Sequence, residues 1–242
     1  LPNYSVFDDK RYFEHGNAAT VVEVGGVRVG VLSDSFDNKG GAAADVASGD
    51  LPGAANPCGH LTPVNVISDM SSGGTDEGRA MVQIVHDLAP GAQLLYATAF
   101  NGELDFANQI LALQAAGANV ISMSLGGPLP NATEKNTFTK LQSAGILSIA
   151  AAGNGGNTQT SYPAGYAPVM SVAALDINKA WATFSQRNKD VEIAAPGVSV
   201  LSTTYNTWRA AHSSPMPAAG PVTTPRRWAL PSASTMNTYR PC

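Results

Sequence analysis

The stretch VISMSLGGPLPNATEKNTFTKLQSAGILSIAAAGN, residues 120–154, decides the fold class of this 242-residue chain. Short apolar runs lie near its two ends, at 120–123 and 146–149. Between them, Asn131 and Glu134 have the spacing of a helix capping box, and Phe138 and Leu141 follow at helical spacing before Gly145. A strand, a helix and a second strand in this order predict two parallel strands of one sheet.

The same alternation extends over most of the chain. Further apolar runs rich in β-branched or bulky residues occur at 27–32, 64–67, 94–97 and 169–172. Helical spacing follows the capping residues and first-turn acids at 75–77 and recurs around 104–111. We therefore predict an α/β fold, doubly wound, with a mainly parallel sheet and helices on both faces. In such sheets, sites form outside the carboxyl ends of the strands.

Composition limits the classes of partner. The length fits a single domain over 1–242, with an atypical Pro-rich tail at 212–242. A net charge of -4 gives no strong attraction for nucleic acid, and no apolar run approaches the ~20 residues of a membrane helix. The start, Leu1-Pro2-Asn3-Tyr4, does not have the pattern of a signal peptide, so we expect either that none existed or that this is a mature or excised chain. We expect a monomer.

Polar and glycine residues follow several of the predicted strands. Asp34 follows the first strand, and Glu77 opens the helix after the second. Ser124, Leu125 and Gly126 follow the strand at 120–123, and Ala152, Gly153 and Asn154 follow the next one along the chain. Because parallel strands end at the same edge of a sheet, we expect carboxylates, an extended glycine segment and an amide to meet there.

Taken in order, these segments resemble the subtilisin-like serine proteases. The resemblance rests on the segments at 120–127 and 151–154, on Ser161-Tyr162-Pro163 and Phe184-Ser185, and on the Ala-Pro-Gly-Val at 195–198. It covers roughly residues 27–211. It implies a secreted, extracellular endopeptidase that hydrolyses polypeptides through an acyl-enzyme, with self-cleavage during maturation.

The resemblance assigns roles residue by residue. Asp34 matches the aspartate that orients the catalytic base, and Asn154 matches the side-chain donor to the oxyanion. The segments Ser124-Leu125-Gly126 and Ala152-Gly153 match the substrate-binding backbone, on which an extended peptide adds as a strand.

The first departure from the family is at the base. Glu77 stands where the family has histidine. Glutamate can act as a base near neutrality only if burial or a like charge such as Asp34 raises its pKa, and activity should then favour acidic to neutral pH. The related sedolisins use a Ser-Glu-Asp set, but they replace the oxyanion asparagine, which this chain keeps. His60 is a weaker alternative base, and we expect His86 to be a surface or partly buried residue.

The second departure is at the nucleophile. Matching the family's Gly-Thr-Ser-Met-Ala to this chain places Pro215 at the serine position. Ser214 is the candidate nucleophile, with Ser213 and the more distant Ser234 as alternatives. The frequent prolines after 215 forbid the long helix that normally follows. Three explanations stay open: an inactive relative, a neighbouring serine that serves, or a tail that differs from the true chain, as after a frame change.

The remaining expectations concern cofactors and competing functions. No cofactor is required; calcium could bind the loop acids Asp37, Asp45, Asp50 and Asp69, and zinc spacing is absent. The two cysteines, Cys58 and Cys242, permit a disulfide without demanding it. The main alternative function is a catalytically inactive subtilisin-like domain that binds extended peptides. A small-molecule binder has little support, because no phosphate-binding or dinucleotide motif is present.

Overall fold

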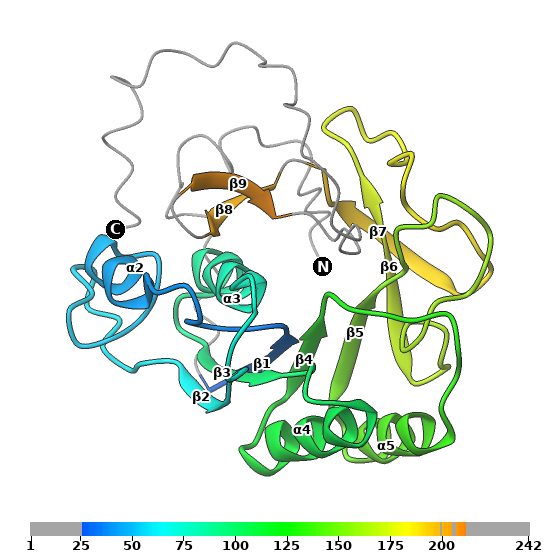
Figure 1. Ribbon diagram of the computed structural model, residues 1–242, viewed down its shortest axis with the longest axis horizontal. Helices are drawn as coiled ribbons and strands as arrows, with labels where there is room; N and C mark the ends of the chain where they lie inside the picture. Colours follow the sequence, from blue (N-terminus) through cyan, green and yellow to red (C-terminus); the bar gives the residue numbers. More distant parts are fainter. Residues whose placement is uncertain (1–25, 199, 205–206, 212–242) are drawn as a thin grey trace.

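Seven strands form one parallel sheet in the order β2-β3-β1-β4-β5-β6-β7 (Figure 1) in the computed structural model, which describes residues 26–198, 200–204 and 207–211. The strands are β1 (Arg28–Ser33), β2 (Asn65–Ser68), β3 (Gln93–Thr98), β4 (Val120–Met123), β5 (Leu147–Ala151), β6 (Val169–Leu175) and β7 (Val191–Pro196). The α/β fold with a mainly parallel sheet is confirmed.

Helices cover both faces of this sheet. The helices α4 (Glu103–Ala115) and α5 (Ala132–Ser143) lie on one face, and α3 (Glu77–Leu88) lies on the other, as Figure 1 shows. The side chains of β1 alternate accordingly: Leu32 packs with the core cluster under α4 and α5, whereas Val31 packs with the cluster under α3. Burial on both faces explains why the strands are continuously apolar.

The order of the strands creates a topological switch point. From β1 the chain proceeds to β2 and β3 on one side, and then returns to β4, which pairs with β1 on the other side. In doubly wound sheets the crevice at this point, beyond the carboxyl ends of the two strands, is where ligands bind. The residues that follow β1 and β4 are Asp34 and Ser124, so both begin at this crevice.

Some elements were not predicted from the sequence. The helix α2 (Ala42–Ser48) has only seven residues; Ala42 and Val46 pack against the core cluster under α3, and its buried residue is Asp45, whose carboxylate pairs with Arg79. An antiparallel hairpin, β8 (Val200–Thr204) and β9 (Thr207–Ala211), packs against α3. The Ser202 hydroxyl donates to the Ala80 carbonyl and the Gln83 amide oxygen. No described helix has the length and apolarity of a membrane span.

Candidate active site

Asp34 is the first residue after β1 and is buried, with 9% of its surface exposed. One carboxylate oxygen accepts hydrogen bonds from the amides of Ser35 and, at 3.4 Å, Gly78. The other accepts from both the amide and the hydroxyl of Thr75. A carboxylate at a helix N-terminus is favoured by the helix dipole. Asp34 therefore joins the end of β1 to the start of α3.

Glu77 is the first residue of α3 and is partly buried. Burial raises its pKa from the ordinary 4.5 to about 7, a hydrogen bond with the Ser124 side chain lowers it, and the charge of Asp34 raises it. Residues 34, 77 and 124, far apart in sequence, therefore interact at the switch point. The pKa places the titration of Glu77 at the neutral end of the range expected from the sequence. Ser124, predicted to bind substrate, also contacts the candidate base.

The start of α3 differs from the expected capping pattern. Asp76 is the N-cap residue, but it adopts a left-handed conformation, with φ 63°, and its side chain does not cap the helix. Gly78 lies directly on the sheet: a Cβ there would come within 2.8 Å of the Ser35 carbonyl and would also meet the Tyr96 ring. A glycine after Glu77 thus lets α3 approach the sheet closely enough to bring Glu77 to Asp34.

The predicted substrate-binding segment extends from the end of β4. Gly127 forms an antiparallel bridge with Tyr162, in which each amide donates to the other residue's carbonyl at 2.8 Å. A Cβ on Gly126 would lie 2.9 Å from the Ser161 hydroxyl oxygen. No described residue donates to or accepts from the main chain of Leu125 or Gly126. This backbone can therefore receive an added strand.

The predicted oxyanion segment follows β5, next to β4 in the sheet. The Ala152 amide donates to the Val172 carbonyl, and the Gly153 carbonyl accepts from the Gln186 amide, each at 2.9 Å. Gly153 has φ 111°, and a Cβ there would collide with the Gln186 side chain, so the turn requires glycine. Asn154 follows, partly exposed, at the same sheet edge as Ser124.

The candidate nucleophile Ser214 lies outside the described residues, as do Ser213, Ser234 and the whole tail at 212–242. Cys58 lies in the described loop after α2, but Cys242 does not belong to the described part.

His60, the alternative base, and His86 lie away from this arrangement. His86 is buried, with 2% exposed, so the expectation of a surface or partly buried residue was wrong. Burial, followed by the neighbouring His60 ring at 5.1 Å, lowers its pKa to about 4. His86 stands nine residues beyond Glu77 on α3, about 13 Å along the helix axis. These two rings pack on each other at a distance from the helix start.

The four acids considered for calcium have protein partners. Asp37 and Asp45 pair with Arg79, Asp69 accepts the amides of Phe36 and Asp37, and Asp50 accepts the Ser48 hydroxyl. Within the described ranges, no group of three or more His, Cys, Asp or Glu residues could hold a metal ion.

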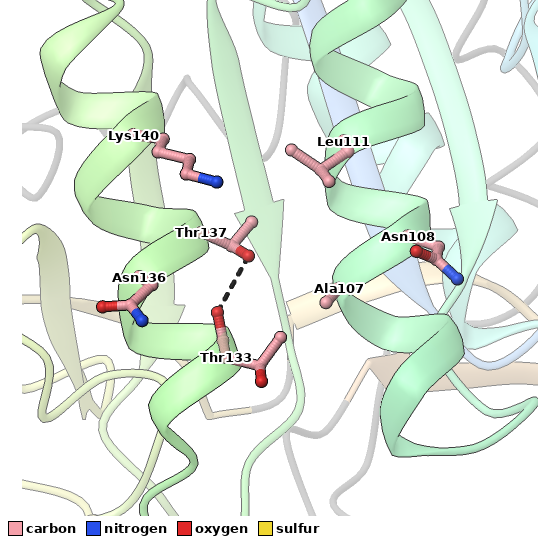
Figure 2. Close-up of a pocket in the computed structure, with 7 residues that line it drawn as sticks. All are labelled: Ala107, Asn108, Leu111, Thr133, Asn136, Thr137 and Lys140. Carbon is pink, nitrogen blue, oxygen red and sulfur yellow. Dashed lines mark hydrogen bonds between the residues drawn. The ribbon is translucent and has the colours of Figure 1, made fainter.

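A separate hollow of about 430 Å³ opens between α4 and α5 (Figure 2). These two helices lie on the opposite face of the sheet from α3 (Figure 1). Threonine, asparagine and alanine side chains line much of it, together with Leu111 and Lys140. The Thr137 hydroxyl donates to the Thr133 carbonyl at 2.9 Å. The lining contains no carboxylate, histidine or cysteine, so it offers no acid–base pair for catalysis.

Comparison with known proteins identifies similar sequences and folds. The sequence profile described as the subtilase family matches residues 57–219. Subtilisin BL of Lederbergia lenta is 46% identical over 87 residues, which cover 36% of this chain and 32% of that protein. Alkaline elastase YaB of Bacillus sp. (strain YaB) is 31% identical over 188 residues, covering 74% of this chain and 47% of that protein. The chain thus spans less than half the length of these relatives.

Solved structures agree with this similarity. The psychrophilic subtilisin-like protease Apa1 from Pseudoalteromonas sp. AS-11 has a TM-score of 0.57 and 28% identity, covering 74% of this chain and 43% of that chain. The patellamide maturation protease PatA has a TM-score of 0.61 at 23% identity, covering 78% of this chain and 73% of that chain, and supports the fold alone.

Proposed function

This chain belongs to the subtilase family, and we propose that it is a serine endopeptidase in which Glu77 replaces histidine as the general base. The observation that carries the proposal is that the Glu77 carboxyl group hydrogen-bonds the Ser124 side chain and is close enough to Asp34 to feel its charge, with a pKa raised to about 7. A base with that pKa is about half ionised at neutral pH. It can therefore accept a proton from a hydroxyl and later return it.

The proposed reaction has two halves. The serine oxygen attacks the carbonyl carbon of the scissile bond as its proton passes to Glu77, and the protonated Glu77 then gives that proton to the leaving amine. A water molecule repeats the sequence on the acyl-enzyme, with Glu77 again taking and returning one proton. The charge of Asp34 increases the proton affinity of Glu77. The Asp34 carboxylate also accepts hydrogen bonds from the amides of Thr75 and Gly78, which fix the start of the helix that carries the base.

The proposed substrate is an extended polypeptide. Its main chain pairs with the backbone of Ser124–Gly126, and Ala152 and Gly153 form the adjoining wall. The Asn154 side chain donates to the oxyanion, which forms on the carbonyl oxygen. The open main chain of Leu125 and Gly126 supports this assignment.

We propose Ser214 as the nucleophile, within a single extracellular, monomeric domain that requires no cofactor. The proline that stands at the family's serine position favours the alternative, a catalytically inactive subtilase domain that binds extended peptides at the same edge.

A fluorophosphonate probe distinguishes the two functions. The wild-type chain and the matched variants Ser214→Ala and Ser213→Ala would be labelled and digested, and the modified peptide identified by mass spectrometry. Label on Ser214, lost only in Ser214→Ala, supports the enzyme. Folded protein that takes no label, yet binds extended peptides, supports the inactive domain. Peptide mapping of residues 205–242 in the same digest establishes the sequence of the tail.

A further inference from the structure

Arg79 is a buried cation on α3 that the proposed mechanism does not use. Its side chain is only 2% exposed. It pairs with three carboxylates: Asp76 at 2.7 Å, Asp45 at 2.8 Å and Asp37 at 2.9 Å. Its guanidinium also donates to the Phe36 carbonyl at 2.9 Å. Such a site uses the planar fork of arginine, which a lysine does not reproduce.

These partners come from three segments around the candidate active site. Asp76 precedes Glu77 at the start of α3, Asp37 lies in the loop that begins with Asp34, and Asp45 lies on α2. Arg79 therefore joins the helix that carries the base to the loop that carries its partner carboxylate.

Asp76 extends this connection toward the base pair. Its carboxylate accepts the Ser35 hydroxyl at 2.7 Å, and its own amide donates to the same hydroxyl at 2.8 Å. It also accepts the amides of Asn38 and Lys39. These bonds hold Asp76 in the left-handed conformation that leads the chain into Glu77, a conformation that residues other than glycine rarely adopt.

We propose that Arg79 is a positioning residue that, through Asp76 and Asp37, fixes the loop of Asp34 against the first turn of α3 and so sets the placement of Glu77. The catalytic consequence of this role rests on the proposed function. The contacts that join Arg79 to Asp76 and Asp37 are independent of that function. The sequence signal was available, because Asp76 and Arg79 have the i, i+3 spacing of a helical ion pair.

The three carboxylates that contact Arg79 also neutralise its positive charge. Within the described part of the chain, no basic side chain pairs with Glu77, whereas three carboxylates share Arg79. The charged or titratable residues on the elements around the base, besides Asp34, Asp37, Asp45 and Asp69, are Lys39 in the loop after β1, Arg28 in β1, Tyr96 in β3, and Asp76, Arg79, His86 and Asp87 in α3 or at its cap; the sequence of β9 also contains Arg209. β8 contains no titratable residue.

The experiment combines two variants with a matched control. Asp37→Asn removes one partner of Arg79 at a position whose side chain is 44% exposed, so the variant should fold. Glu192→Gln, at an exposed position on β7, removes one charge elsewhere. Arg79→Lys keeps the cation but loses the fork. The pKa of Glu77 is read by carbon-13 NMR of labelled glutamate carboxyl groups, with Glu77→Gln identifying its signal.

We expect Asp37→Asn to lower the pKa of Glu77 by about half a pH unit, because less of the Arg79 charge is neutralised. Glu192→Gln should leave it unchanged. Arg79→Lys should lower kcat on the order of 100-fold with little change in KM, because the reacting groups are misplaced. Equal effects of Asp37→Asn and Glu192→Gln on the pKa, or a wild-type kcat in folded Arg79→Lys, would overturn the proposal. If no variant hydrolyses peptides, the proposed function fails, but the positioning role is still tested: the Glu77 titration should shift in Arg79→Lys, which keeps the charge and loses the contacts, and an unshifted titration in that folded variant would overturn it.

Discussion

Replacing Glu77 by glutamine tests the candidate base through stability as well as activity. The side chain keeps its size and can still hydrogen-bond Ser124, but it no longer ionises. In the wild-type chain, the pKa rises from the ordinary 4.5 to about 7 on folding because the carboxyl group is buried near Asp34. Folding therefore favours the protonated form, and the cost of ionising Glu77 in the fold is removed in Glu77→Gln.

The direction and size of the effect follow from proton linkage. Between pH 4.5 and 7 the folded chain holds a proton that the unfolded chain has lost, so wild-type stability falls as pH rises through this interval. The total loss is about 3 kcal/mol at roughly 1.4 kcal/mol per pH unit. At pH 8, Glu77→Gln should be more stable than wild type by up to that amount, and at pH 4 the two should agree.

Urea unfolding followed by circular dichroism, at pH 4, 6 and 8, measures this difference, with Glu192→Gln as the control for the loss of one exposed carboxyl group. The same Glu77→Gln protein should lose about 100- to 10,000-fold in kcat/KM, as expected for a missing general base. In the wild type, kcat/KM should rise as Glu77 loses its proton around pH 7, so activity should favour neutral pH and above instead of the acidic to neutral range expected from the sequence. A stabilisation that is the same at pH 4 and pH 8 would refute the raised pKa, and undiminished kcat/KM in Glu77→Gln would refute its role as base.

Other variants probe the remaining parts of the site. Asp34→Asn should lower the pKa of Glu77 because a neighbouring negative charge is removed, moving the rise of kcat/KM to lower pH; a profile that stays in place would contradict the electrostatic role. Asn154→Ala should reduce kcat about 100- to 1000-fold with a small change in KM, the range measured for such a donor in subtilisin. If Asn154 only bound substrate, steady-state kinetics would instead show a higher KM with an unchanged kcat. Gly126→Ala should raise KM for peptides, because its Cβ would crowd the Ser161 hydroxyl at 2.9 Å; unchanged peptide affinity by calorimetry would exclude Gly126 from the binding edge.

The architecture could be predicted from local patterns. Continuous apolar runs separated by helical spacing already imply buried parallel strands, because each strand must be covered on both faces. The cap at Asn131 was predicted in the same way, and its side chain accepts the amides of Thr133 and Glu134. The helix α2 escaped prediction because its seven residues are too few to show a helical period, and its buried residue, Asp45, is held by an ion pair with Arg79.

Sequence position and family resemblance predicted roles for Asp34, Glu77 and Ser124. No local sequence pattern predicts that their side chains interact. Their meeting depends on the strand order, which places the ends of β1 and β4 side by side, and on Gly78, which lets α3 lie against Tyr96. The sequence likewise shows that residue 77 is a glutamate, but it does not show the proton affinity of that glutamate. That property comes from the removal of water around its carboxyl group and from the nearby charge of Asp34, both of which exist only once distant segments of the chain have packed together.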